Sequence, residues 1–144
     1  TLGISSLSER EEGYKQSMHE HNLSANIHYT TYGAVEKDVK NIIEDALQRG
    51  VDALFLPTYS LCAKALQIIK EKGRFIPKDL ALVGFDESYV YSLYSNTVAH
   101  IVQPLRELGE KSVELLHQMI EGIPSDRTII LKPTLIKGES AERK

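Results

Sequence analysis

The sequence predicts an α/β protein with a three-layer α/β/α arrangement around a mainly parallel sheet. Two short apolar runs, at residues 53–56 and 80–85, have the length and composition of strands that are buried on both faces. Segments with apolar residues at helical spacing alternate with these runs. Strands and helices that alternate in this way form right-handed crossover units, which place successive strands parallel in one sheet.

The composition is that of an ordinary globular domain. The 144 residues include 42% hydrophobic and 26% charged residues, which excludes a disordered or disulfide-rich chain and leaves no apolar run long enough for a membrane span. The formal net charge of −3 argues against nucleic-acid binding by this segment itself. Cys62 is the single cysteine and no signal peptide is visible, so we expect a cytoplasmic protein with no membrane partner.

The first part of the chain predicts a helix, a strand and a second helix. Residues 8–21 open with Ser-Glu-Arg-Glu, which is a capping-box pattern. Residues 25–29 alternate apolar and polar side chains, as a strand does. Residues 35–47 form the clearest amphipathic helix, and Gly50 supplies its stop.

The second part continues the alternation and then departs from it. A helix over residues 60–72 separates the two buried strands, and a tyrosine-rich polar loop follows Asp86. Pro104 then opens a long helix with an apolar stripe, which must leave water. The remaining expected elements are short strands at 98–102, 128–131 and 134–136 and a polar tail at 141–144.

Nothing in the sequence predicts catalysis, a metal or a cofactor. Cys62 is interpreted as a small buried hydrophobe within its helix. His19, Glu20 and His21 are adjacent on a helix, so their side chains point in different directions and are interpreted as a solvated face. The chain contains neither a phosphate-binding P-loop motif nor a dinucleotide-binding glycine motif.

A better candidate site lies at the carboxyl ends of the predicted strands, where open α/β sheets bind ligands. Asp86 follows a buried strand and could accept hydrogen bonds from vicinal hydroxyls, and Arg10 could donate a planar fork to a ligand oxygen. Tyr32 also follows a strand and offers a flat face for a sugar or a base. A purely structural role remains an alternative for each residue. Asp86 could be a turn residue, Arg10 could form a surface ion pair, and Tyr32 could cover the core.

Several motifs in one order carry a family resemblance. They are Arg10-Glu11-Glu12-Gly13-Tyr14, the segment 76–87 with Gly84-Phe85-Asp86, and Gln103-Pro104 followed by Leu108-Gly109. Lys137-Gly138-Glu139-Ser140 completes the set. With these motifs the chain resembles the effector domain of LacI/GalR-type bacterial transcription regulators over nearly its whole length.

The resemblance implies a periplasmic-binding-protein-like (type I) lobe that senses a small molecule. Residues 1–103 would form the C-terminal lobe, residues 104–130 would belong to the N-terminal lobe, and residues 131–144 would return to the C-terminal lobe. Family members bind operator DNA through a helix-turn-helix domain, which this segment lacks, and act as homodimers. Whether the first strand of the lobe is present stays open, because a gap-free match places Thr1 in the loop before Arg10.

The same resemblance assigns residues to the site. Arg10 and Asp86 match the effector-binding arginine and aspartate, Tyr32 matches a stacking aromatic, and Thr58 falls where a polar residue contacts ligand. Thr58-Tyr59 stands at the place of the family's usual Asn-Asp pair, so this part of the site differs from the family pattern.

Ala63 and Tyr94 represent the dimer surface that the resemblance implies. A solute-binding protein of the same fold, or a small α/β enzyme, remains an alternative to a regulator. The full-length gene would separate these three classes, since it would encode a helix-turn-helix, a secretion signal or neither.

Overall fold

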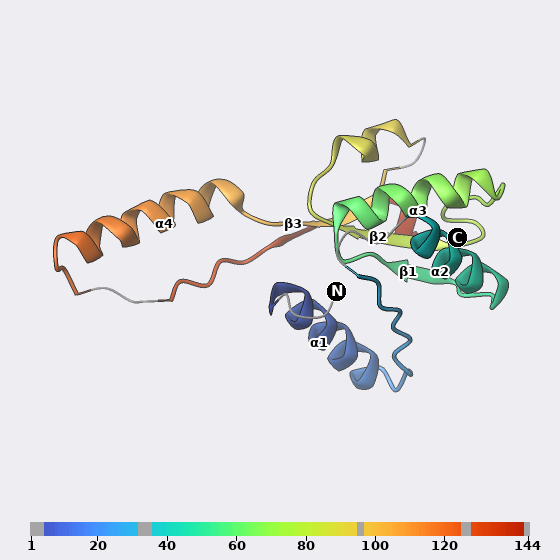
Figure 1. Cartoon of the computed structure of the whole chain (residues 1–144), viewed down its shortest axis with the longest axis horizontal. Helices are drawn as coiled ribbons and strands as arrows, with labels where there is room; N and C mark the ends of the chain where they lie inside the picture. Colours follow the sequence, from blue (N-terminus) through green and yellow to red (C-terminus); the bar gives the residue numbers. More distant parts are fainter. Residues whose placement is uncertain (1–4, 32–35, 95–96, 125–127, 143–144) are drawn as a thin grey trace.

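The structure is a computed structural model that describes residues 5–31, 36–94, 97–124 and 128–142. Helices and strands alternate along most of the chain (Figure 1). In order, the elements are α1 (Ser5–Glu20), α2 (Glu36–Gln48), β1 (Ala53–Phe55), α3 (Tyr59–Glu71), β2 (Ala81–Phe85), the 3-10 helix η1 (Tyr89–Leu93), β3 (Ala99–Val102), α4 (Leu105–Ile120), β4 (Thr134–Ile136) and the 3-10 helix η2 (Glu139–Ala141).

The four strands form one sheet in the order β1-β2-β3-β4. The first three are parallel, as the pairing of Leu54 with Leu82 and of Gly84 with His100 shows. β4 is antiparallel to β3, because the chain leaves the sheet after β3 and comes back along it. The α/β class with a mainly parallel sheet is therefore confirmed.

The hydrophobic core lies between this sheet and the helices α2 and α3, which also pack on each other. α3 contributes most, because its apolar residues recur three and four positions apart on the face that meets β2. Val39 and Ile43 of α2 complete this layer. The fully buried large side chains of the core include Leu66, Ile69, Leu80 and Leu82.

Tyr91 of η1 contacts the sheet beside Cys62. The Tyr91 hydroxyl donates to the Phe85 carbonyl at 3.4 Å, and its ring lies 4.9 Å from that of His100 between centroids. A Cβ on Gly84 would stand 2.6 Å from the Tyr91 Oη, so the tyrosine needs a glycine below it. Cys62 has no exposed surface, which confirms that it is a small buried core residue.

Burial raises the pKa of the Cys62 thiol to about 11 and raises that of Tyr91 as well. Between pH 9 and pH 11 the unfolded chain therefore releases the Cys62 proton while the folded chain keeps it. We expect the free energy of unfolding to fall over this interval, by about 1–3 kcal/mol from Cys62 alone. Urea unfolding of the wild type and of Cys62→Ala at a series of pH values measures this, and equal pH slopes in the two proteins would contradict it.

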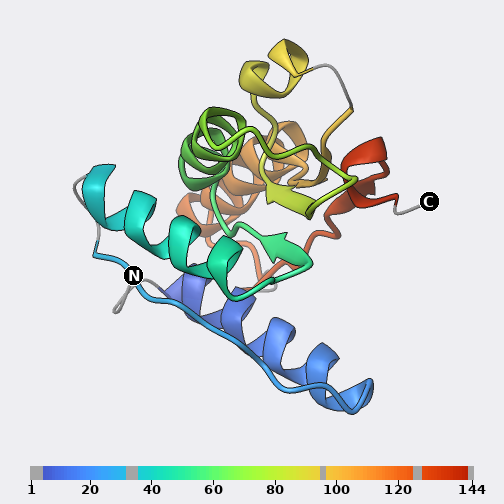
Figure 2. The same cartoon turned by 90° about the vertical axis from the view of Figure 1, so that its right-hand side faces the viewer.

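Two expectations for the first thirty residues are wrong. α1 begins at Ser5, so Ser8 lies inside the helix and does not cap it. Residues 25–29 form no strand, because a strand needs a hydrogen-bonded neighbour and the sheet described for this chain ends at β1. The segment instead runs alongside α1 (Figure 2), where the Asn26 N–H donates to the Tyr14 hydroxyl at 3.3 Å.

A second contact ties this segment to α1. The Tyr29 hydroxyl donates to Glu11 Oε1 at 2.7 Å, and Lys15 pairs with the same carboxylate at 2.5 Å. Both partners lower the pKa of the Glu11 carboxyl below its ordinary value, and Lys15 has the larger effect. None of the residues of α1 is buried.

One expectation for the C-terminal part is also wrong. Residues 128–131 are not a strand, although β4 forms at the expected place. Ser140 of η2, which comes just before the expected polar tail, is 1% exposed. Its hydroxyl donates to the Leu82 carbonyl at 2.6 Å and accepts from the Ala99 N–H at 2.8 Å, so η2 joins β2 to β3.

α4 and the chain that returns from it extend away from the sheet (Figure 1). We call residues 105–124 and 128–133 the arm. α4 is strongly amphipathic, yet it has no buried residue. Its exposed apolar side chains are Leu105, Leu108, Val113, Leu116, Met119 and Ile120.

Candidate ligand site

Polar residues follow β1, β2 and β3 at the same edge of the sheet, because the three strands are parallel. Thr58 comes shortly after β1, Asp86 directly after β2 and Gln103 directly after β3. This is the carboxyl edge, where α/β proteins bind small ligands.

Arg10 brings α1 to this edge. Its Nη1 donates to the Pro57 carbonyl at 2.6 Å, and its guanidinium carbon lies 3.6 Å from the centroid of the Phe85 ring. A guanidinium in that position is stabilised by the electron-rich face of the ring. Since Pro57 precedes Thr58 and Phe85 precedes Asp86, these contacts bring the three predicted site residues into one neighbourhood.

Asp86 occupies an unusual backbone conformation. Its φ is +67°, in the left-handed region that few residues other than glycine adopt and in which aspartate is among the tolerated exceptions. Its N–H donates to the Ile101 carbonyl at 2.8 Å, and Gln103 Nε2 donates to its Oδ1 at 2.5 Å. Backbone strain of this kind persists where surrounding contacts enforce it, and it gathers at ligand sites.

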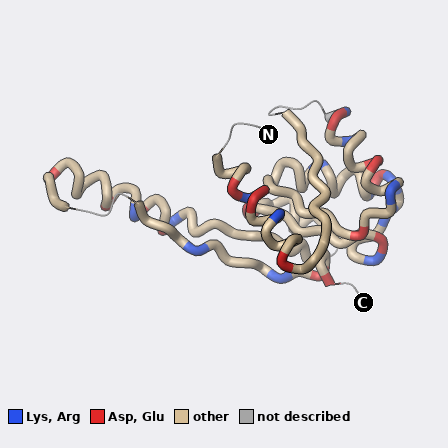
Figure 3. The backbone as a smooth tube through the Cα atoms, turned by 90° about the horizontal axis from the view of Figure 1, so that it is seen from below, with Lys and Arg blue, Asp and Glu red and all other residues tan. Residues whose placement is uncertain are grey.

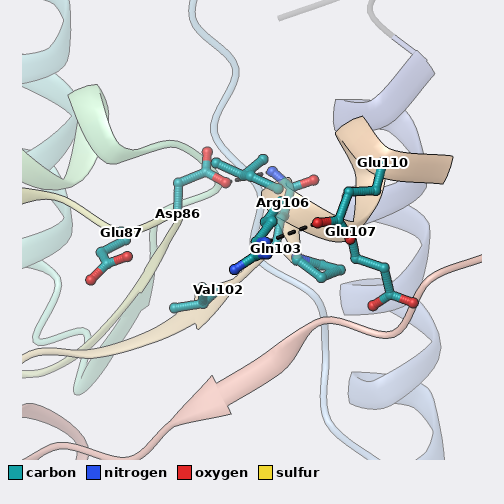
Figure 4. Close-up of a pocket in the computed structure, with 9 residues that line it drawn as sticks. Asp86, Glu87, Val102, Gln103, Arg106, Glu107 and Glu110 are labelled. Carbon is teal, nitrogen blue, oxygen red and sulfur yellow. Dashed lines mark hydrogen bonds and ion pairs between the residues drawn. The ribbon is translucent and has the colours of Figure 1, made fainter. Parts of the chain in front are cut away.

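A cavity of about 490 Å³ opens between Asp86 and the start of α4. Its size suits a small organic ligand. Figure 4 shows the side chains around it, which come from the β2 end, the β3 end and the first turns of α4. The lining residues are Asp86, Glu87, Val102, Gln103, Pro104, Leu105, Arg106, Glu107 and Glu110.

The lining combines a mainly apolar surface, to which Val102, Pro104 and Leu105 belong, with several negatively charged side chains. Asp86, Glu87, Glu107 and Glu110 supply carboxylates, and the Nε of Arg106 donates to Glu110 Oε1 at 2.9 Å. Carboxylates accept hydrogen bonds from hydroxyl groups, and an amide both donates and accepts. This chemistry fits a polyhydroxylated ligand.

The other predicted site residues are placed as follows. Thr58 is half-buried and caps α3, since its Oγ1 accepts from the Leu61 N–H at 3.3 Å and lies 3.3 Å from the Ser60 hydroxyl oxygen. Tyr32 lies outside the described residues. The two residues assigned to a dimer surface lie in one region, because Ala63 belongs to α3 and the Tyr94 hydroxyl donates to the Leu66 carbonyl of α3 at 2.7 Å.

Gln103 and the first turns of α4 were not assigned to the site from the sequence. Gln103 was interpreted only as part of a family motif and as the residue before a helix. The signal that selects Asp86 could also have selected Gln103, because each follows a strand of the same parallel sheet. Arg106, Glu107 and Glu110 carry no such signal, since their approach to Asp86 depends on where α4 starts.

Other kinds of site find little support in the part of the chain that the structure describes. It contains no group of three histidine, cysteine or acidic side chains that could hold a metal ion. His21, one of the three adjacent residues considered above, instead contacts the Ser17 carbonyl through Nδ1 at 2.8 Å. Lys and Arg lie among Asp and Glu on the helices and connections (Figure 3), and the four strands of the described sheet contain none of these residues. None of the described helices combines the length and apolar character needed to cross a membrane.

The fold and this polar edge define the ligand-binding lobe of an open α/β protein. The family described as the periplasmic binding protein-like domain matches residues 5–141, and the chain belongs to it. Among curated relatives, the ribose operon repressor of Haemophilus influenzae is 28% identical over 138 residues, which cover 91% of this chain and 41% of the repressor. The chain thus spans about two fifths of the length of that relative.

Solved structures give the same assignment. A protein of Staphylococcus saprophyticus described as a transcription regulator is 30% identical, with a TM-score of 0.86 over 97% of this chain and 53% of that one. A sugar-binding transcriptional regulator of the LacI family from Escherichia coli shares the fold, with 20% identity and a TM-score of 0.81 over 97% of this chain and 51% of that one. The resemblance to LacI/GalR-type regulators is confirmed.

Proposed function

We propose that the chain is the effector-binding lobe of a transcription regulator and that it senses a small molecule, a sugar or a sugar derivative, without catalysing a reaction. The observation that carries this proposal is the cavity at the carboxyl edge, where Asp86 is held by Gln103. The names of the relatives, a ribose operon repressor and a sugar-binding regulator, agree with a sugar effector.

Four residues are proposed to contact the effector: Arg10, Tyr32, Thr58 and Asp86. The half-buried carboxylate of Asp86 can accept from two neighbouring hydroxyls, and Arg10 can donate its remaining N–H groups to a ligand oxygen. Partial burial favours both interactions, because competition from water is reduced there. Thr58 would contribute its hydroxyl while it caps α3.

The arm is proposed to belong to a first lobe that a longer protein supplies. Residues 104–130 would pack there, and residues 1–103 and 131–144 would form the second lobe. The support is the exposed apolar stripe of α4. Burial of this stripe would contribute a favourable free energy of about 25 cal/mol for each Å² removed from water. Ligand bound between two lobes would favour the closed arrangement and so shift the population of DNA-competent protein.

The partners proposed for the whole protein follow from this arrangement. Operator DNA would bind to a helix-turn-helix domain outside this segment, in the cytoplasm. A second copy would pack on the surface represented by Ala63 and Tyr94. Two observations support that surface. Ala63 of α3 is half-buried, and the Tyr94 hydroxyl contacts the same helix.

Titration of the ¹⁵N-labelled chain with D-ribose, D-glucose and maltose, followed by NMR, tests the proposal. We expect at least one of these sugars to shift the backbone signals of Arg10, Asp86 and Gln103 in a saturable way, while signals from the far end of α2 stay unchanged. NMR detects the weak binding expected of one lobe. Shifts confined to another face, or no shift with any of the three sugars, would contradict the proposal.

A further inference from the structure

We infer that the cavity between Asp86 and α4 prefers a sugar derivative that carries a positive charge, namely an amino sugar with a protonated amine. The inference rests on the proposed function, because it concerns the ligand of the same cavity. It adds the charge of that ligand, which the fold alone does not specify.

The first support is the formal charge of the residues that line the cavity. These nine residues include four carboxylates and one guanidinium, so their formal charge at pH 7 is −3. The whole chain has the same formal charge of −3, which means that the residues outside the lining are neutral in sum. The excess negative charge is therefore concentrated around the cavity, where it attracts cations and repels anions.

The second support is that the carboxylates come from two different elements. Asp86 and Glu87 follow β2, whereas Glu107 and Glu110 lie in the first turns of α4 (Figure 4). An ammonium group has three donors, so it can pair with carboxylates that approach it from different directions. A neutral hydroxyl has one donor and cannot use this arrangement as fully.

The guanidinium among the described lining residues does not balance this charge. The Nε of Arg106 donates to Glu110 Oε1 at 2.9 Å, and the Arg106 side chain is 92% exposed. Arg10 is not among the lining residues, and its guanidinium lies over the Phe85 ring. A negatively charged ligand such as a sugar phosphate would therefore meet more carboxylates than cations.

The start of α4 does not provide an anion site either. A helix N-terminus ordinarily attracts anions through its free N–H groups. Here Pro104 precedes the helix and has no N–H, and the Leu105 N–H donates to the Gln103 carbonyl at 2.8 Å. Glu107 adds a carboxylate to the first turn, where the helix dipole stabilises it.

The apolar part of the lining favours an organic cation over a metal ion. Val102, Pro104 and Leu105 can contact the C–H groups of a sugar ring. The cavity of about 490 Å³ is also larger than a metal ion requires. Among the residues that the structure describes, no three histidine, cysteine or acidic side chains are grouped so that they could hold a metal ion.

The first test compares D-glucosamine with N-acetyl-D-glucosamine by NMR titration of the ¹⁵N-labelled chain at about pH 6. The two sugars differ at one nitrogen, which is protonated and charged at this pH in the first and neutral in the second. We expect D-glucosamine to bind about tenfold more tightly at low salt, and the difference to shrink at about 0.5 M salt, because salt screens exposed charges. D-glucose 6-phosphate should bind more weakly than D-glucose.

The second test changes one carboxylate of the lining. Glu107→Gln should lower the affinity for D-glucosamine about threefold and leave that for N-acetyl-D-glucosamine unchanged. Glu114→Gln is the matched control, because Glu114 also lies in α4 but pairs with Lys111 outside the cavity lining. The ratio of the two dissociation constants is measured on one protein at a time, so a change in the stability of a variant does not affect it.

The outcomes distinguish this inference from the proposed function. If no sugar, charged or neutral, shifts the signals of Arg10, Asp86 and Gln103, the proposed function fails and the inference fails with it. If N-acetyl-D-glucosamine binds as tightly as D-glucosamine at low salt, or if Glu107→Gln leaves their ratio unchanged, the inference alone is overturned. Shifts by D-glucosamine that are confined to another acidic surface would overturn it as well.

Discussion

An alanine at position 138 is expected to lower the free energy of unfolding by about 2–3 kcal/mol or more. The added Cβ would lie 2.5 Å from the Ala99 nitrogen, 2.6 Å from the Thr97 oxygen and 2.7 Å from the Val98 carbonyl carbon. All three are backbone atoms, which cannot rotate away as a side chain can. The φ of Gly138 is ordinary for an extended residue, so the glycine is needed for the close approach alone.

The loss of stability is large because the same segment positions η2 through hydrogen bonds. The Ser140 N–H donates to the Thr97 carbonyl at 3.0 Å, and the Glu139 N–H donates to the Thr97 hydroxyl at 3.0 Å. A shift of the backbone at Gly138 moves these groups together with the buried Ser140 hydroxyl. Urea unfolding of Gly138→Ala measures the loss.

Gly13→Ala is the matched control for this prediction. Gly13 lies inside α1, and nothing stands within 4 Å of the Cβ it would gain. That variant should be as stable as the wild type or up to about 1 kcal/mol more stable, because alanine favours a helix. A Gly138→Ala protein within about 0.5 kcal/mol of the wild type would show that the close contact at η2 relaxes without cost.

The second large effect concerns the proposed ligand site. Asp86→Asn and Arg10→Ala are each expected to weaken binding of the sugar by about 1–3 kcal/mol, since each removes a charged hydrogen-bonding partner. Asparagine tolerates the left-handed backbone of position 86, so the turn itself should persist. The NMR titration described above, repeated on each variant, gives the affinities.

Arg49→Ala serves as the control for the charge change. Arg49 pairs with Asp45 at the exposed end of α2, and its loss should not alter binding. Arg10→Ala also removes packing on Phe85, so its unfolding curve must be recorded beside its affinity. Unchanged affinity in both Asp86→Asn and Arg10→Ala would exclude these residues from the ligand site.

Much of the fold could be predicted from the sequence because it depends on local composition. The run at 80–85 is apolar on both faces, and its Leu80, Leu82 and Phe85 are buried as expected. The helical spacing in α2 and α3 specified their buried faces in the same way. Asp86 could be predicted as a site residue because ligands bind at the carboxyl ends of parallel strands, and Asp86 directly follows a buried strand. The expected burial of the run at 53–56 is wrong for its strand, because β1 lies at the edge of the described sheet, where Ala53 is exposed and Leu54 and Phe55 are only half-buried.

The remaining features depend on partners that are distant in the sequence. Residues 25–29 alternate like a strand, but pairing decides whether a strand forms, and periodicity does not report the neighbour. Ser140 is buried because it fits between Leu82 and Ala99, which are 58 and 41 positions away. The approach of Gln103 to Asp86 likewise appears only when two strand ends lie side by side.

The return of β4 to the sheet has a consequence for how the chain is made. β4 and η2 are synthesised after the whole arm, and until they arrive β3 is an open edge with unpaired backbone groups, while the Ala99 N–H and the Leu82 carbonyl lack the Ser140 hydroxyl. An open edge of this kind can pair with another unfinished chain. Closure of the sheet therefore has to wait for the arm to be synthesised, and the nascent chain that still lacks β4 exposes an edge prone to aggregation.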